Sequence, residues 1–170
     1  YILVSWKDPG GWHDRAFTEA AKAEEFLNSV EADVYFSPTT YSQPHRKKEY
    51  VQPSRWLWQD LDAVSPNNIY PRPTIAWESS PGRFQALWRL SEPLAGTELE
   101  AVNKALANKV HADQGSWILT KVLRLPGTTN YKYAAKPKGK LLWNDGPVVS
   151  KGIIEKELPS KALEILGSPA

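Results

Sequence analysis

The stretch Arg55-Trp56-Leu57-Trp58-Gln59-Asp60-Leu61-Asp62 is the most informative segment of the sequence. Its aromatic and aliphatic residues are typical of a β-strand. Residues two apart in a strand point to the same face, so the pattern predicts that the carboxylates of Asp60 and Asp62 project together. Leu61 then faces the opposite side. We therefore expect the strand to end on a pair of neighbouring acids.

This acid pair is a candidate metal site. Like charges held close together repel each other, and a divalent cation relieves the repulsion. Hard oxygen ligands at this spacing suit Mg²⁺ or Mn²⁺. Two aspartates at the end of a strand also commonly just begin a turn, because Asp is a favoured turn residue. The D-x-D pattern alone leaves both interpretations open.

The segments that follow the strand predict a hairpin and a helix. The runs Thr74–Trp77 and Phe84–Leu90 flank the turn Ser80-Pro81-Gly82, which indicates two strands joined as a hairpin. Thr97 and Glu100 have the spacing of a capping box, which predicts a helix over residues 97–110. One apolar stripe supports this helix, formed by Leu99, Val102, Leu106 and Val110.

The remaining segments complete a two-layer α+β prediction. Helices packed on a mixed sheet are the simplest way to bury the apolar faces of such elements. We expect strands over residues 1–6, 33–36 and 140–143, a turn over 8–11, helices over 15–30 and 160–166, and a polar loop over 37–53.

Composition narrows the possible functions. The chain has 170 residues, of which 41% are hydrophobic and 24% charged, values typical of one globular domain. With no cysteine, disulfides, thiolate zinc sites and a cysteine nucleophile are excluded. No apolar run is long enough for a membrane helix, so we expect a soluble protein. Because the chain begins at Tyr1 and contains no methionine, we expect residues 1–170 to be one domain of a longer multidomain protein.

The positive charges are unevenly distributed. The formal net charge is only +2, but His45-Arg46-Lys47-Lys48 is a compact basic cluster, and residues 114–144 contain no acid. Arg46, Lys47 and Lys48 are candidate contacts to nucleic-acid phosphates. A solvated loop explains the same cluster equally well.

Two turns place cations beside small residues. Arg83 follows Ser80-Pro81-Gly82, and Arg124-Leu125-Pro126-Gly127-Thr128-Thr129-Asn130-Tyr131-Lys132 joins a tight turn to two cations. Backbone N–H groups and cations in such turns can hold a phosphate. The alternatives are a plain hairpin turn for the first segment and, for Arg124, a structural ion pair with an acid.

Taken in order, these segments resemble the archaeo-eukaryotic primase superfamily, in particular the primase-polymerase branch of phages, plasmids and other mobile elements, which is often fused to a helicase. The resemblance runs from Tyr35 to Tyr133. Trp58-Gln59-Asp60-Leu61-Asp62 is similar to the hydrophobic D-x-D motif, and the segment from Ser80 to Trp88 is similar to the second motif. The run Arg124–Lys132 matches the R-x-P-G-T-x-N signature and is the most specific of the motifs.

The resemblance implies an RRM-like catalytic core and a DNA primase or polymerase activity. The implied cofactor is Mg²⁺ or Mn²⁺, and the implied partners are single-stranded DNA template, primer, NTP or dNTP, and a helicase domain on the same polypeptide. The implied location is the cytoplasm of a prokaryotic or phage-infected cell. The implied catalytic metal ligands are Asp60, Asp62 and Asp113, and the implied nucleotide contacts are Ser80, Arg83, Gln85, Arg124 and Lys132.

Two positions depart from the family pattern. Gln85 stands where the family usually has histidine, and glutamine can hydrogen-bond a phosphate but cannot become a cation. Ile118 stands where many relatives have an aspartate, so either Asp113 replaces that acid or the second metal site is impaired.

Two alternative functions stay open, and the two departures motivate the first of them. One is a primase-like module that has lost its chemistry and only binds nucleic acid or nucleotide. The other is an RNA-binding α+β domain that stacks bases on tryptophans. The candidate stacking residues are Trp12, Trp56, Trp58 and Trp117, for which a core position is the more common role.

Overall fold

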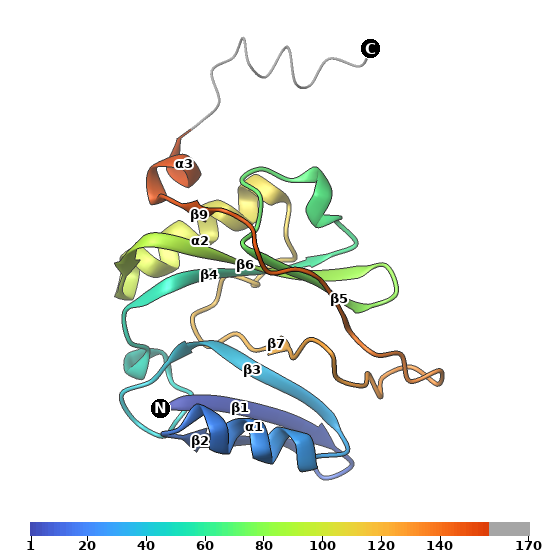
Figure 1. Cartoon of the computed structure of the whole chain (residues 1–170). Coiled ribbons are helices and arrows are strands. Elements are labelled where there is room, and N and C mark those ends of the chain that lie inside the picture. The colour runs from blue at the N-terminus through green and yellow to red at the C-terminus, as the bar shows by residue number, and fades with distance from the viewer. Residues whose placement is uncertain (157–170) are drawn as a thin grey trace.

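Two β-sheets form the framework of the chain in a computed structural model that describes residues 1–156 (Figure 1). The helix expected over residues 160–166 lies outside the described residues. The first sheet has the order β2-β1-β3-β7 with every pair antiparallel, and α1 packs on one of its faces. Its elements are β1 (Ile2–Asp8), β2 (Gly11–Phe17), α1 (Ala20–Ser29), β3 (Asp33–Thr40) and β7 (Leu123–Arg124).

The second sheet has the order β4-β6-β5-β8, with antiparallel neighbours, and β9 adds a parallel pair to β6. Mixed pairing is thus confined to this sheet. The expected α+β class is confirmed, with the strands divided between two sheets. The strands are β4 (Ser54–Asp62), β5 (Ile75–Ser80), β6 (Arg83–Leu94), β8 (Lys140–Trp143) and β9 (Val148–Val149).

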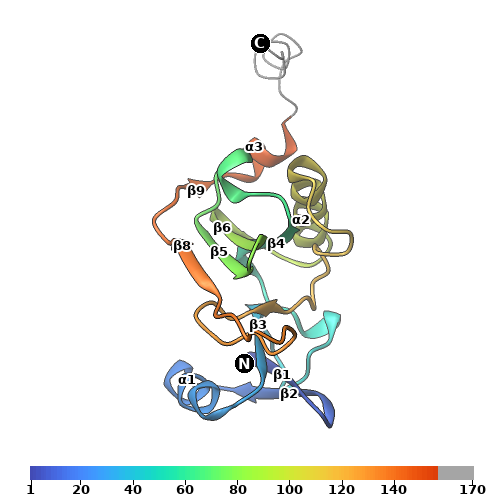
Figure 2. The same cartoon turned by 90° about the vertical axis from the view of Figure 1, so that its right-hand side faces the viewer.

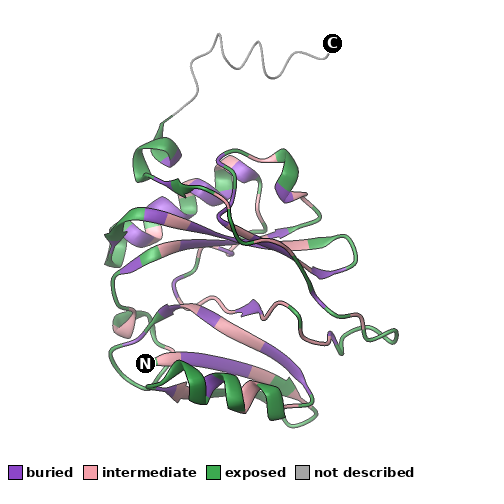
Figure 3. Ribbon diagram, in the orientation of Figure 1, coloured by how far each residue is buried: buried purple, intermediate pink, exposed green. Residues whose placement is uncertain are grey.

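The main core is built around the second sheet (Figure 3) and includes residues of α2 (Gly96–Val110) and Leu123 of β7, with Phe36 of β3 packed against it. Trp58, Trp77 and Trp88 are fully buried there, which settles Trp58 as a core residue. The predicted stripe of α2 is buried as well, since Leu99, Val102, Leu106 and Val110 all belong to this core. The short helices are α3 (Lys151–Glu155), η1 (Lys48–Tyr50) and η2 (Pro66–Asn68).

The N-terminal helix prediction is wrong for its first residues. Residues 15–17 belong to β2, which pairs with β1 in a hairpin that closes at Asp8 and Gly11. Gly11 has φ = 108°, a backbone conformation that glycine adopts without strain, and this turn sends the chain back along β1. The helix α1 therefore begins only at Ala20.

Two further details differ from the prediction. The capping box is absent, because α2 begins at Gly96 with Ala95 as its N-cap and no side-chain cap. Thr97 already lies inside the first turn. The polar loop is also shorter than expected, because β3 continues to Thr40 and Tyr41 pairs with Val51 across the loop.

The two sheets meet along β7 and the segment that follows it. Figures 1 and 2 both show this segment running between the strands of the first sheet and those of the second. None of the helices in residues 1–156 is long and apolar enough to cross a membrane.

Candidate active site

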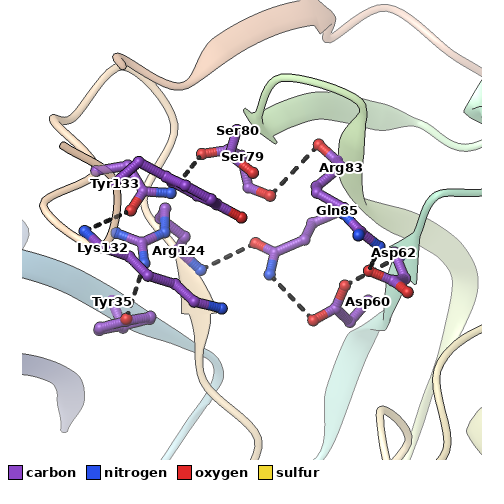
Figure 4. A pocket seen from close by; sticks show the side chains of 11 residues that line it. Tyr35, Asp60, Asp62, Ser79, Ser80, Arg83, Gln85, Arg124, Lys132 and Tyr133 are labelled. Atoms are coloured by element: carbon purple, nitrogen blue, oxygen red, sulfur yellow. Dashed lines mark hydrogen bonds and ion pairs between the residues drawn. The ribbon is translucent and has the colours of Figure 1, made fainter. Parts of the chain in front are cut away.

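A polar pocket of about 330 Å³ opens between the two sheets (Figure 4). The end of β4, the β5–β6 hairpin, β7 and the loop after β7 all contribute to it. Most of the side chains predicted to bind metal or nucleotide therefore meet in one place. The lining residues are Tyr35, Asp60, Asp62, Ser79, Ser80, Arg83, Gln85, Arg124, Asn130, Lys132 and Tyr133.

The acid pair lies at one side of this pocket. Leu61 is fully buried between two partly or fully exposed aspartates, as the alternating strand pattern predicts. The register between β4 and β6 shifts between Asp60 and Asp62, and Asp62 has φ = 50°. The backbone N–H of Asp62 donates to Asp60 Oδ1 at 3.1 Å. At this bulge, both aspartates line the pocket at the end of the strand.

Arg83 lies directly beside the acid pair. Its guanidinium donates a hydrogen bond to Asp62 Oδ1, and both side chains are about half exposed. Arg83 pairs with Ser80 across the turn that contains Gly82 at φ = 75°. The hairpin thus delivers a cation and a hydroxyl group to the pocket from its two strands.

Gln85 is buried in the wall of the pocket and makes three hydrogen bonds. Its Nε2 donates to Asp60 Oδ2 at 3.5 Å. Its Oε1 accepts from the indole nitrogen of Trp77 at 3.3 Å and from the backbone nitrogen of Arg124 at 2.9 Å. Because Oε1 faces two N–H donors, the amide nitrogen must face the acid pair. Toward the acid pair, the chain therefore offers a neutral donor.

Arg124 is held in a buried ion pair. Its Nη1 donates to Asp33 Oδ1 at 2.7 Å, its Nη2 donates to the Tyr35 hydroxyl at 3.0 Å, and the Arg124 and Asp33 side chains are 8% and 12% exposed. Burial raises the pKa of Tyr35, an effect that the Arg124 charge partly offsets. The structural ion pair considered from the sequence is therefore present, although Arg124 also lines the pocket.

The loop after β7 forms the remaining wall. Asn130 is buried, donates to the backbone oxygen of Ser79 at 3.3 Å and accepts from the backbone nitrogen of Lys132 at 3.0 Å. These two bonds hold Lys132 over the hairpin that carries Ser80. Lys132 is exposed, and its Nζ lies 5.9 Å from the ring centroid of Tyr133.

Sequence reasoning missed four lining residues: Tyr35, Ser79, Asn130 and Tyr133. Asn130 belongs to the R-x-P-G-T-x-N string, so the string itself signalled its importance. Ser79 directly precedes Ser80. Tyr35 had no local signal, because its place depends on the pairing of β3 with β7 opposite Arg124.

Asp113, the predicted third acid, does not line the pocket. Its backbone nitrogen donates to the backbone oxygen of Asp60 at 2.9 Å, but the residue lines a separate hollow with Lys104 and Trp117. Residues 1–156 contain no group of three or more acids or histidines that could hold a metal. The third-ligand role of Asp113 stays a prediction.

The basic cluster lies outside the pocket as well. Arg46 contacts the Asp14 carboxylate at 3.3 Å and donates to the backbone oxygen of Thr120 at 3.0 Å. Lys48 pairs with Glu100 at 2.8 Å, whereas Lys47 is exposed. Arg46 and Lys48 thus have structural partners, and the phosphate-binding role of the cluster stays a prediction.

Comparisons with solved structures define the class of this fold. The AEP domain of the cyanophage S-2L primase-polymerase aligns with a TM-score of 0.69 at 11% identity, over 90% of this chain and 85% of that one. The catalytic domain of primase RepB', solved in complex with initiator DNA, aligns with a TM-score of 0.69 at 21% identity, over 91% of this chain and 83% of that one. A second RepB' structure gives a TM-score of 0.66 at 21% identity, over 91% of this chain and 55% of that longer one. The fold is that of primase and primase-polymerase catalytic domains.

A match to a family model identifies the family of this chain more specifically than the fold does. The model of the RepB DNA-primase N-terminal domain matches residues 38–144, and the chain belongs to this family. The resemblance to the primase-polymerase branch is thereby confirmed. No curated protein sequence gives a significant match. Family and fold together support a DNA-primase function.

Proposed function

We propose that the chain is a metal-dependent nucleotidyltransferase that adds NTP or dNTP units to a primer on a single-stranded DNA template. The observation that carries this proposal is the convergence of two acids and two exposed cations in one polar pocket. Asp60 and Asp62 come from β4, Arg83 from β6, and Lys132 from the loop after β7. Family membership in the primases supports the same reaction class.

Asp60 and Asp62 are the proposed ligands of Mg²⁺ or Mn²⁺. Their donor set fits such an ion, because both are hard carboxylate oxygens at one edge of the pocket. The Asp62 side chain is 57% exposed, so its oxygens remain accessible even beside Arg83. When bound, the ion would favour the deprotonated 3′ hydroxyl of the primer and neutralise charge on the leaving pyrophosphate.

Ser80, Arg83, Gln85, Arg124 and Lys132 are the proposed nucleotide contacts. Arg83 and Lys132 are exposed cations and can pair directly with phosphate oxygens. Gln85 presents its Nε2 beside Asp60 and can donate one neutral hydrogen bond to a phosphate. Arg124 adds positive charge from inside the wall, while its bonds to Asp33 and Tyr35 hold it in place. These groups would orient the triphosphate without themselves taking up a proton.

A second candidate function is binding of nucleotide or nucleic acid without chemistry. Two observations favour it: Arg83 pairs with the Asp62 carboxylate, and Asp113 lies outside the pocket. If Arg83 keeps its pair with Asp62 when a nucleotide is present, the arginine competes with a metal ion for that carboxylate.

A primer-extension assay separates the two candidates. A primed single-stranded template is incubated with labelled dNTP or NTP and Mn²⁺, with the wild-type chain and with an Asp60→Asn/Asp62→Asn variant. The proposed enzyme gives product only with the wild type. Product that persists in the double variant rejects the metal assignment, and wild-type binding of the template without product supports the second candidate.

The wider setting rests on the resemblance to the primase-polymerase branch. We propose that the chain acts in the replication of a mobile element, beside a helicase domain on the same polypeptide. The corresponding location is the cytoplasm of a prokaryotic or phage-infected cell. Family membership supports the role in replication.

A further inference from the structure

The face of the first sheet opposite α1 carries a row of polar and aromatic residues. Lys7 of β1 pairs in register with Trp12 of β2 on one side and with Asp33 of β3 on the other. Directly paired residues share one face of a sheet, so these three side chains form a row across the strands. Val4 lies on the other face and packs with Ala23 of α1.

This face continues into the polar pocket. A second hollow of about 330 Å³ is lined in part by Lys7, Asp33 and Tyr131. It shares Tyr35, Arg124 and Lys132 with the pocket that contains the acid pair. In Figure 1 the turn between β1 and β2 lies at the same end of the molecule as the loop after β7. The two hollows are therefore adjacent parts of one surface.

Aromatic rings line this surface without being buried. Trp12 is 51% exposed and Tyr131 is 40% exposed. The Trp12 ring lies 4.8 Å from the ring of Tyr35, which reaches into both hollows. Exposed rings beside a catalytic pocket offer stacking faces that the fold itself does not use.

The charges of the surface favour a polyanion. Of its acids, Asp33 is ion-paired with Arg124, and Asp8 contacts the Nε2 atom of His13 at 3.0 Å. Within residues 1–156, neither Lys7 nor Lys136 has an acidic partner. Lys136 Nζ lies 5.6 Å from the ring centroid of Tyr131, so a cation and a stacking face occur together.

We propose that this surface binds single-stranded DNA beside the nucleotide pocket, with unpaired bases stacked on Trp12 and Tyr131 and phosphates held by Lys7 and Lys136. The inference rests on the proposed function, because it assigns a place to the template strand of that reaction. Stacking on both aromatic faces requires unpaired bases, so the surface favours a single strand over a duplex.

The test measures DNA binding separately from chemistry. Fluorescence anisotropy follows a labelled single-stranded thymidine oligonucleotide, and a labelled duplex, in EDTA without nucleotide. The variants are Trp12→Ala, Trp12→Phe and Lys7→Ala/Lys136→Ala. Lys22→Ala is the matched control, because Lys22 is an exposed lysine of α1, on the opposite face of the same sheet.

Trp12→Ala is expected to weaken single-strand binding roughly 5- to 150-fold, the factor that corresponds to ~1–3 kcal/mol of stacking per base. Trp12→Phe is expected to retain most of the affinity, because it keeps a stacking face. The lysine variant is expected to reduce the slope of log affinity against log salt by about 1.4, from ~0.7 per phosphate contact on a single strand. Lys22→Ala is expected to bind as the wild type does.

The outcomes also separate this inference from the proposed function. Unchanged binding by Trp12→Ala and by the lysine variant overturns the inference, even if the wild type extends primers. Equal affinity for the duplex overturns it as well. If these variants lose binding and the wild type makes no product, the proposed DNA-binding surface is supported and the proposed enzymatic activity is rejected. If Trp12→Ala does not fold, the affinity of the lysine variant and its salt dependence test the proposed surface instead.

Discussion

The side-chain oxygen of Gln85 accepts a hydrogen bond of 2.9 Å from the backbone nitrogen of Arg124, and this bond joins the two sheets of the fold. Gln85 belongs to β6 and Arg124 to β7. The same glutamine reaches Asp60 through its nitrogen. Gln85 therefore connects the acid pair to the opposite wall of the pocket.

Replacing Gln85 with leucine should destabilise the fold. The substitution leaves the Trp77 indole N–H and the Arg124 backbone N–H without an acceptor in a buried position. Each such donor costs about 1–3 kcal/mol, so urea denaturation should show at least that loss in the free energy of unfolding. Gln52→Leu is the control, because Gln52 is exposed. Equal stabilities of the two variants would contradict the role given to Gln85.

Replacing Asp33 with asparagine should also destabilise the fold. Arg124 would then keep its charge in a buried position without a counter-ion, which costs about 3–5 kcal/mol. Glu98→Gln removes the exposed pair with Lys151 and should change the free energy of unfolding by at most about 1 kcal/mol. A loss from Asp33→Asn as small as that of the control would show that Arg124 does not depend on this acid.

Stability should fall at alkaline pH through Tyr41. Burial raises the pKa of its phenol above the ordinary value of 10.0. Above pH 10.0 the unfolded chain therefore releases this proton while the folded chain retains it, so the stability present below that pH is lost as the pH rises through the folded pKa. Tyr41→Phe should show a flatter decline of Tm above this pH, and Tyr70→Phe, at an exposed position, should match the wild type. Identical pH profiles for wild type and Tyr41→Phe would refute the assignment.

Arg83→Gln should separate nucleotide binding from stability. The Arg83–Asp62 pair is half exposed, so its loss should change the free energy of unfolding by less than about 1 kcal/mol. A lost hydrogen bond to a charged phosphate is worth about 1.5–3 kcal/mol, so KM for the nucleotide should rise roughly tenfold or more. Arg55→Gln, which alters an exposed arginine at the other end of β4, should leave KM unchanged. An unchanged KM in Arg83→Gln would remove this arginine from the site.

Local sequence patterns predicted the elements whose structure depends on residues nearby in the sequence. The strand that ends at Asp62 and the buried stripe of α2 follow from alternation and helical periodicity. By contrast, β7 is only two residues long and is defined by its pairing with β3. The last residues of β2, 15–17, were mistaken for helix, because their place depends on a hairpin register with β1.

In the site as well, local motifs predicted some features, whereas long-range contacts determine others. The motifs located the acid pair, Arg83, Gln85 and Lys132, which the structure gathers in one pocket. The sequence did not indicate which acid pairs with Arg124, because Asp33 lies 91 residues away along the chain. Nor did it indicate that Asp113 lines a different hollow, since that depends on the turn after α2.

The central claim is that Asp60 and Asp62 together hold a divalent cation, and a direct Mn²⁺-binding measurement tests it. Electron paramagnetic resonance of free Mn²⁺ is recorded with the wild type, with Asp60→Asn/Asp62→Asn, and with Asp113→Asn, each checked for its Tm. The account predicts that the wild type depletes free Mn²⁺ and that the double variant does not, while Asp113→Asn shows whether that acid contributes. Equal Mn²⁺ binding by the wild type and a folded Asp60→Asn/Asp62→Asn variant would contradict it.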